Sequence, residues 1–356
     1  LYDLARRPDP LAVGRSLSDL ADLVVRELLI DIAGSGSHRP DGDAPSGPPG
    51  FTLAVLTLGK FGMQAMDYGS DLDLMFVFDP DPGVDPTAAL EPAQRASRRL
   101  IARLEDRAHG LRLYAVDMRL RPSGRQGLLV SSLAGFRSYH GRPLEVWERL
   151  ALIRLRAVAE LHFGPAASPD LGSGSAMPGP LASTVVDEVV SASVWASTDP
   201  QRIACDTRRL KQRIEQELAR ETRDQWDVKT GVGGCLELEL LVAALQLQHD
   251  VRARDIPTAL ERLHERGVLS ATERAKLDEA YRFERLLLNR LRMTRTSGWG
   301  ENDRVAVNSP RLTALARRMG LADRDALVAT LEHQRAVVRA AFDRHLSCDH
   351  AHVGDH

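Results

Sequence analysis

The sequence contains few cysteines, few aromatic residues and almost no net charge. Its 356 residues include 3 cysteines and 5% aromatic residues, and the formal charge at pH 7 is −2. Cys205, Cys235 and Cys348 are far apart and odd in number, so they match neither a disulfide framework nor a zinc-ligand spacing. We therefore expect structural or incidental free thiols. A near-neutral chain also lacks the basic excess of nucleic-acid-binding proteins, which disfavours a polymerase and any nucleic-acid partner.

Long apolar runs are absent as well. No stretch reaches about 18 consecutive apolar residues, and no cationic, apolar leader is present at the start. We therefore expect no membrane partner and a cytoplasmic location. Apolar residues make up 43% of the chain and charged residues 27%, which is enough for a core and a hydrated surface. The length predicts two or three domains.

Changes in composition predict where these domains begin and end. Residues 11–34 have helical apolar spacing, and two stretches rich in Gly, Pro and Ser, 34–50 and 164–180, are typical of loops. From residue 181 onward, apolar residues recur every three or four positions, as in helices. The expected order is an N-terminal helix and flexible loop (1–50), a strand-containing domain (51–163), a linker (164–180), an all-helical bundle (181–346) and a disordered tail (347–356).

The segment Gly69-Ser70-Asp71-Leu72-Asp73 lies between the apolar runs 51–58 and 74–78. In an extended chain the period of two places Asp71 and Asp73 on one face, where they can bind one divalent cation. Gly69 and Ser70 have little side-chain bulk, so backbone N–H groups and a hydroxyl can approach a phosphate closely. Together these residues predict a metal-assisted nucleotide site. The alternative is a solvated strand end with two ordinary acids.

A third carboxylate, Asp117, lies in a second strand-like run and is followed by Arg119 and Arg121. On a neighbouring strand, Asp117 would complete a clamp for two Mg²⁺ ions about 4 Å apart. If the strand continues, the two arginines share one face, and their planar guanidinium groups suit phosphate oxygens. Pairing of the arginines with the acids is the alternative in the metal-free state.

Several motifs in a fixed order resemble the glutamine synthetase adenylyltransferase family, which is part of the polymerase-beta-like nucleotidyltransferase superfamily. They are Leu58-Gly59-Lys60-Phe61-Gly62, Met66 to Leu74, Val116 to Gly124, Gly127 to Ser131, Phe136 with Tyr139, Trp147-Glu148-Arg149, Asp227-Val228-Lys229, Gly233-Gly234 and Glu237-Leu238-Glu239. The resemblance covers about residues 51–345. It implies an α+β fold: a small mixed sheet with flanking helices, followed by a helical domain.

The resemblance also implies an activity, its cofactors and its partners. Family members usually contain two such units: one moves AMP from ATP to a tyrosine of glutamine synthetase with Mg²⁺, and the other removes it by phosphorolysis. This sequence contains one unit and begins with Leu1, so we expect a piece of a longer enzyme. Its motifs look more like the adenylylating half. The alternatives are the adenylyl-removing half and a non-catalytic docking module. A PII-type signalling protein is the regulator that the family implies.

The resemblance assigns further residues to the site. Lys60, Arg119 or Arg121 would neutralise the outer phosphates of ATP, and Lys229 could contact phosphate. Glu237 or Glu239 could bind a metal or the incoming tyrosine, although residues two apart on a helix point about 200° apart, so at most one faces the site. The alternative is that the glycines and acids near residue 233 only form a turn and a helix start.

Three other side chains carry structural expectations. We expect Trp147 to be buried beneath the sheet with its indole N–H paired, because tryptophan is usually a core residue. Arg154 and Arg156 alternate along the chain. We expect surface charges at both positions, and further phosphate contacts are the alternative.

Overall fold

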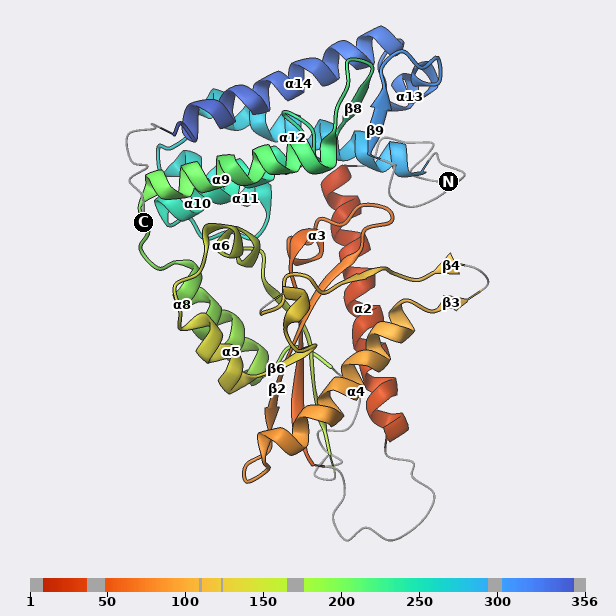
Figure 1. Cartoon of the computed structure of the whole chain (residues 1–356). Helices are drawn as coiled ribbons and strands as arrows, with labels where there is room; N and C mark the ends of the chain where they lie inside the picture. The colour runs from red at the N-terminus through yellow and green to blue at the C-terminus, as the bar shows by residue number, and fades with distance from the viewer. Residues whose placement is uncertain are drawn as a thin grey trace. The chain divides into compact units, whose positions relative to one another are not determined.

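The computed structural model describes residues 9–36, 49–108, 111–122, 124–164, 176–293 and 303–348 (Figure 1). The chain divides into two compact units. We call Ser16–Met66 with Ser70–Ala196 the sheet unit, and Leu1–Arg15, Asp67–Gly69 and Ser197–His356 the helical unit. The expected loop 34–50 and linker 164–180 lie largely outside the described residues, as do residues 349–356 of the expected tail.

The sheet unit alternates short strands with helices. Its elements, in chain order, are α2 (Pro10–Gly36, which begins in the helical unit), β1 (Phe51–Thr57), α3 (Gly59–Gly62), β2 (Leu72–Pro80), α4 (Pro86–Leu104), β3 (Arg107–Ala108), β4 (Leu111–Arg112), β5 (Val116–Asp117), the 3₁₀-helix η1 (Gly124–Gln126), β6 (Val130–Ser132), α5 (Leu133–His140), α6 (Val146–Leu152), β7 (Arg156–Phe163), α7 (Pro180–Ser183), the π-helix η2 (Thr184–Val190) and α8 (Ser191–Val194).

Five of these strands form a mixed sheet. Its main order is β5-β2-β1-β7, and β6 also pairs with β2. β1 is antiparallel to β2 and to β7, whereas β5 and β6 are parallel to β2. β5 pairs with the first residues of β2, and β6 pairs with its later part, from Phe76 to Phe78. This arrangement confirms the small mixed sheet with flanking helices.

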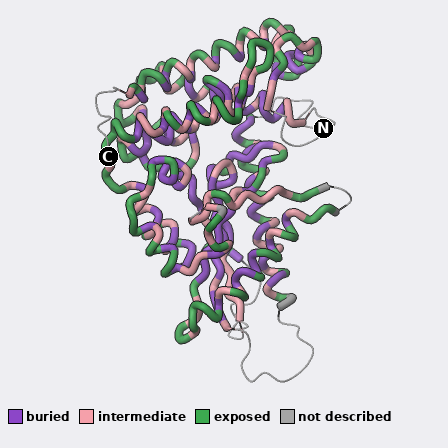
Figure 2. Tube along the Cα trace, viewed as in Figure 1, coloured by how far each residue is buried: buried purple, intermediate pink, exposed green. Residues whose placement is uncertain are grey.

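One face of the sheet packs against α2 and α4. Alternate residues of β2, from Leu72 to Phe78, join a buried cluster with Val25 and Leu29 of α2 and Leu100 of α4. Figure 2 shows these strands as mostly buried. α4 begins at a side-chain cap, because Asp85 accepts a hydrogen bond from the Thr87 N–H at 3.0 Å. The residues between the core positions of β2 point to the opposite face, and Asp73 is one of them.

Trp147 and the two arginines differ from expectation. Trp147 is 47% exposed, because the neighbouring Glu148 turns inward to close a capping box with Glu145 at the start of α6. Arg154 and Arg156 are buried. Two parallel hydrogen bonds of 2.8 Å join the Arg156 guanidinium to Asp22 on α2. The alternating pattern could not reveal this partner, which lies 134 residues away.

The helical unit is built mainly of long helices. Its elements are α9 (Pro200–Ile214), the π-helix η3 (Glu215–Ala219), β8 (Gln225–Asp227), α10 (Cys235–His249), α11 (Ile256–Glu265), α12 (Ala271–Met293), β9 (Arg304–Ala306), α13 (Leu312–Met319) and α14 (Arg324–His345). β8 and β9 form an antiparallel pair, so the expectation of an all-helical domain was too simple. Gly320, at φ +78°, ends α13 and separates it from α14.

Within the described residues, no helix combines the length and the apolar composition that crossing a membrane requires.

Candidate nucleotide and metal site

Asp73 and Asp117 lie side by side on neighbouring strands. β2 and β5 are parallel, with Leu72 opposite Val116 and Asp73 opposite Asp117. Residues in register on adjacent strands point to the same face of a sheet, and Asp71 precedes Asp73 by one strand period. Asp71 and Asp117 line one pocket, together with Val116, Met118, Arg119 and Arg121. The sheet unit therefore brings together the three predicted acids and both predicted arginines.

A glycine lets the backbone approach Asp73. Gly59 has φ +55°, and a Cβ atom at this position would overlap the Asp73 carboxylate. The Leu58 N–H and the Thr57 hydroxyl both donate to the Asp73 carbonyl, at 3.0 and 2.9 Å. Lys60, in the same turn, is half-buried. Gly59 belongs to one of the sequence motifs, but the motif does not indicate its role. Only the structure shows its positive φ, which explains the need for a glycine.

Asp117 is held by the arginine two residues after it. Its Oδ1 atom accepts the Arg119 backbone N–H at 2.9 Å, and the Arg119 Nε lies 2.7 Å from Oδ2. The hydrogen bonds and charge of Asp117, assisted by Asp73 and Asp71, raise the pKa of Arg119. Arg119 therefore pairs with Asp117 in this structure, and the charges of Asp73 and Asp71 act on it more weakly, which agrees with the metal-free alternative.

Arg121 has a different task, because the strand does not continue. β5 ends at Asp117, and the chain turns at residues 119–120. The expected extended face shared by Arg119 and Arg121 is therefore absent. Arg121 Nη1 donates to the Met118 carbonyl at 2.7 Å, and its Nε donates to the Gly127 carbonyl at 3.4 Å, so this side chain braces the turn.

The donor set suits a hard cation. Carboxylate oxygens are the ligands that Mg²⁺ prefers, and neighbouring acids repel one another unless a cation lies nearby. In the present arrangement, no three His, Cys, Asp or Glu side chains of the described ranges are close enough to share a metal ion. Binding of a metal to Asp117 would therefore require Arg119 to release it.

The remaining predicted residues divide between the units. Ser70, which is 8% exposed, belongs to the sheet unit. Gly69, Lys229, Glu237 and Glu239 belong to the helical unit. Gly69 is exposed and has φ +69°.

Glu237 is fully buried and paired inside the helical unit. Its Oε2 atom lies 3.0 Å from the Lys211 ammonium and accepts the Gly233 N–H at 2.9 Å, while its Oε1 atom lies 3.5 Å from Arg339. Both oxygens therefore face protein cations, which speaks for a structural charge in place of the expected metal ligand.

Glu239 faces another side of α10, as the helical period predicted. Its Oε1 atom is 3.4 Å from the Cys235 Sγ, and its charge helps to raise the pKa of the buried Arg285, which pairs with Asp67. Glu237 and Glu239 therefore do not share one site.

Lys229 belongs to what we call the glycine loop, residues 227–234. Asp227 Oδ1 accepts the backbone N–H groups of Lys229 and Thr230, at 3.0 and 2.7 Å. Gly233 has φ +68°, and a Cβ atom there would overlap the backbone of Arg335 on α14. This close packing explains why a glycine is needed at position 233.

Comparison with known proteins identifies similar sequences for both units. Residues 2–164 match the family model described as glutamate-ammonia ligase adenylyltransferase. Residues 208–346 match the model described as GlnD PII-uridylyltransferase.

Several curated relatives carry the name bifunctional glutamine synthetase adenylyltransferase/adenylyl-removing enzyme. The Xanthobacter autotrophicus protein is 33% identical over 83% of this chain and 29% of its own length. The Burkholderia pseudomallei protein is 31% identical over 96% of this chain and 37% of its own length. The Streptomyces coelicolor protein is 29% identical over 87% of this chain and 29% of its own length. The chain thus spans about a third of the length of these relatives.

Proposed function

Since the chain belongs to the glutamate-ammonia ligase adenylyltransferase family, we propose that it moves AMP from ATP to a tyrosine hydroxyl of glutamine synthetase. The observation that carries this proposal is the register of Asp73 with Asp117, with Asp71 one strand period before Asp73. A family likeness without these acids would fit a docking module equally well. Like-charged side chains are costly to hold together and are typical of a site that binds a cation.

Asp71, Asp73 and Asp117 are the residues that would hold the metal. Two Mg²⁺ ions bound to these carboxylates would supply charge neutralisation at the reacting phosphate and the departing pyrophosphate. The Arg119 guanidinium already occupies this acidic environment, which supports the idea that the residues suit a cation.

The protein's own side chains have separate tasks in this proposal. Arg119 leaves Asp117 and turns to the phosphates, which its exposed side chain can reach. Asp117, once free, accepts the proton of the attacking tyrosine hydroxyl, whose unperturbed pKa is near 10. Lys60 and Ser70 provide positive charge and a hydroxyl for the triphosphate. Gly59 keeps the backbone close enough to Asp73 to fix its carboxylate. Catalysis is then mainly positioning and charge neutralisation.

The reverse activity is the second candidate, because the names of the relatives include adenylyl removal. The same acids would then serve phosphorolysis of adenylyl-tyrosine, with inorganic phosphate as the nucleophile and ADP as the product. Several motifs resemble the adenylylating half more closely, so we place adenylylation first. A PII-type protein is the proposed regulator, and the match of residues 208–346 is the observation that supports it.

Product analysis tests both directions. The chain is incubated with Mg²⁺, α-labelled ATP and unmodified glutamine synthetase, and separately with phosphate and adenylylated glutamine synthetase. We expect label on glutamine synthetase and release of pyrophosphate in the first reaction. If the second reaction alone gave a product, as ADP, the chain would have the adenylyl-removing activity and not the adenylylating one. No product in either reaction, from a chain shown to be folded, would contradict the proposed activity and favour a docking role.

A further inference from the structure

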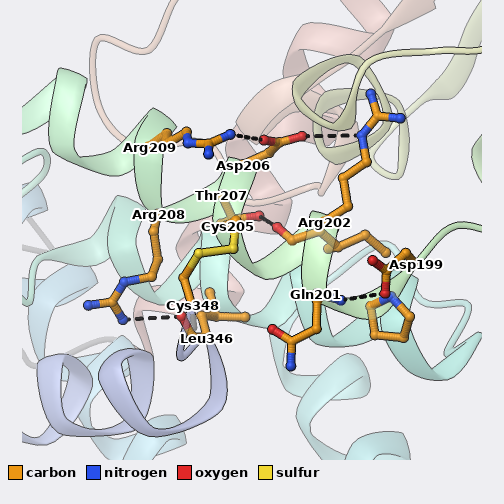
Figure 3. Close-up of a disulfide and its surroundings, with 12 residues drawn as sticks. Asp199, Gln201, Arg202, Cys205, Asp206, Thr207, Arg208, Arg209, Leu346 and Cys348 are labelled. Carbon is orange, nitrogen blue, oxygen red and sulfur yellow. Dashed lines mark hydrogen bonds and ion pairs between the residues drawn. A yellow bond between two sulfur atoms is a disulfide. The ribbon is translucent and has the colours of Figure 1, made fainter. Parts of the chain in front are cut away.

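Two of the three cysteines are joined in the helical unit. Cys205 and Cys348 form a disulfide with a Cα–Cα distance of 5.2 Å, within the normal range for such bonds (Figure 3). The expectation of free thiols was therefore wrong for this pair, which is 143 residues apart in sequence. Cys235 takes no part in this disulfide, and it is buried.

The bond fastens the end of one helix to the start of another. Cys205 lies in the second turn of α9, and Cys348 follows the end of α14 at His345. Both cysteines are half-buried, whereas Cys235 is 1% exposed. An external thiol can therefore reach this pair more easily than it can reach Cys235.

Noncovalent contacts hold the same helix end without the disulfide. Arg208 Nη2 lies 2.9 Å from Asp343 Oδ1. Arg208 Nη1 donates to the Leu346 carbonyl at 3.2 Å (Figure 3). Phe342 and Leu346 are buried, at 2% and 0% exposure. Because these contacts do not depend on the sulfur atoms, α14 can keep its fold when the bond opens, while its last turn loses a covalent anchor and opens locally more easily. Arg208 also lies one turn from Cys205 on α9, where a cation favours the reactive thiolate.

The fastened helix also braces the glycine loop. Arg335 on α14 donates to the Val232 carbonyl at 2.7 Å and makes two bonds to Glu221, of 2.8 and 2.6 Å. Glu221 in turn accepts the backbone N–H groups of Asp227 and Val232, at 2.7 and 3.1 Å. These contacts join α14 to the glycine loop.

We propose that Cys205 and Cys348 form a reversible thiol–disulfide exchange site that controls the order of the end of α14 and of the glycine loop. A dithiol reductant, either a small molecule or a protein, attacks one sulfur as its thiolate and forms a mixed disulfide. Its second thiolate then displaces the first sulfur. Two cysteine thiols and one oxidised reductant result, with two electrons and two protons transferred. A disulfide oxidant reverses the reaction. This inference does not depend on the proposed adenylyl transfer.

Alkylation tests the exchange reaction. The air-oxidised chain is treated with iodoacetamide while native, then after dithiothreitol, and finally in denaturant, with the modified peptides identified by mass spectrometry. We expect no modified cysteine at first, modification of Cys205 and Cys348 after reduction, and modification of Cys235 only in denaturant. Modification of Cys205 and Cys348 without reductant would show that the disulfide does not form. Modification of the pair only in denaturant would show a purely structural bond. Either result would overturn the proposal.

Hydrogen exchange tests the consequence of opening the bond. On reduction, we expect amide exchange in the last turn of α14 and in residues 228–234 to become at least about threefold faster, because local opening becomes easier. Exchange in α4 serves as the internal reference. Cys205→Ser should show the fast exchange with or without reductant, and Cys235→Ser should behave like the unsubstituted chain. Unchanged exchange at α14 and the loop would overturn the proposed control.

Discussion

The acidic pocket of the sheet unit and the interior of the helical unit hold their charged side chains in different ways. In the sheet unit, the Arg119 side chain that pairs with Asp117 is 65% exposed, and Asp71 is exposed. In the helical unit, the side chains of Lys211 and Glu237 are 1% and 0% exposed. A charge pair at the surface can exchange partners at little cost, whereas separating a buried pair leaves an uncompensated charge in the interior. The exposed side chains of Arg119 and Asp71 are therefore accessible to a ligand, whereas the buried pair of the helical unit maintains the fold.

The largest expected effect is on activity, from an acid of the exposed cluster. Asp71→Asn removes one negative charge from the proposed metal site, and electrostatic contributions of this kind are worth about 10²–10³-fold in turnover. We expect adenylyl transfer to fall by at least this factor with an unchanged melting temperature, since Asp71 is exposed. Initial rates and thermal unfolding are the measurements.

The matched control for this substitution is Asp19→Asn on α2, which removes an exposed acid outside the pocket. It should retain full activity. Normal Mg²⁺-dependent turnover in Asp71→Asn would contradict the site.

The second prediction concerns stability and the buried pair. Lys211→Met leaves Glu237 without its closest cation, so we expect the free energy of unfolding to fall by about 3 kcal/mol, the low end for breaking a buried pair. Arg339, at 3.5 Å, compensates for part of the charge. Urea unfolding of the chain gives the value.

The double substitution Lys211→Met/Glu237→Leu is the control, because it removes both charges. It should recover most of the loss. A double variant that is less stable than the single one would mean that Glu237 has a role beyond charge pairing.

The third prediction concerns a buried histidine, His140, and tests how strongly the interior of the sheet unit excludes charge. Burial, with a further contribution from Arg142, lowers the pKa of His140 to about 4, although Glu148 acts in the opposite direction. Neither ring nitrogen has a hydrogen-bond partner among the described residues. Since the folded pKa is below the unfolded value near 6.5, stability is complete above pH 6.5 and is lost as the pH falls toward 4. The loss should approach about 1.4 kcal/mol per pH unit.

Urea unfolding between pH 7.5 and 4.5 measures this slope. His140→Leu should make it shallower, because other acids still titrate but the histidine no longer does. Equal slopes for the two proteins would show that His140 is protonated without cost.

The smallest expected effect is on metal affinity without nucleotide. Arg119→Gln removes the cation that competes for Asp117, and exposed ion pairs contribute about 0.2–1 kcal/mol. We therefore expect Mn²⁺ to bind a few-fold more tightly, as measured by calorimetry. Arg99→Gln is the control, because Arg99 is an exposed arginine of α4 outside the pocket, and the metal affinity of this variant should not change. Weaker binding in Arg119→Gln alone would mean that Arg119 orders the acids and does not compete with the metal.

Local patterns accounted for a large part of the fold. The period of two in Asp71-Leu72-Asp73 correctly placed Leu72 in the core and Asp73 on the other face. The helical spacing expected from residue 181 onward is found in α10 and α12, among other helices. These predictions succeeded because the burial of alternate or every third and fourth residue is encoded within a few positions of the chain.

Predictions that depended on distant partners succeeded less often. Arg156 was expected at the surface, since the sequence pattern does not reveal its partner Asp22, 134 residues earlier. Glu237 was considered as a metal ligand, since the pattern does not reveal the cations Lys211 and Arg339 on other helices. Trp147 is exposed because an inward-facing neighbour closes a capping box. Residue type alone could not decide any of these environments.

The sequence by itself indicated β1, β2, the position of β5 and most of the helices, and it singled out the three aspartates as candidate site residues, because hydrophobic period and motif order are local properties. Only the tertiary structure decided that Asp73 and Asp117 lie in register, that Arg119 holds Asp117, and that Cys205 meets Cys348. The physical reason is that electrostatic and covalent partnership depends on distances of a few ångströms between residues that may be far apart in the chain, and packing sets those distances.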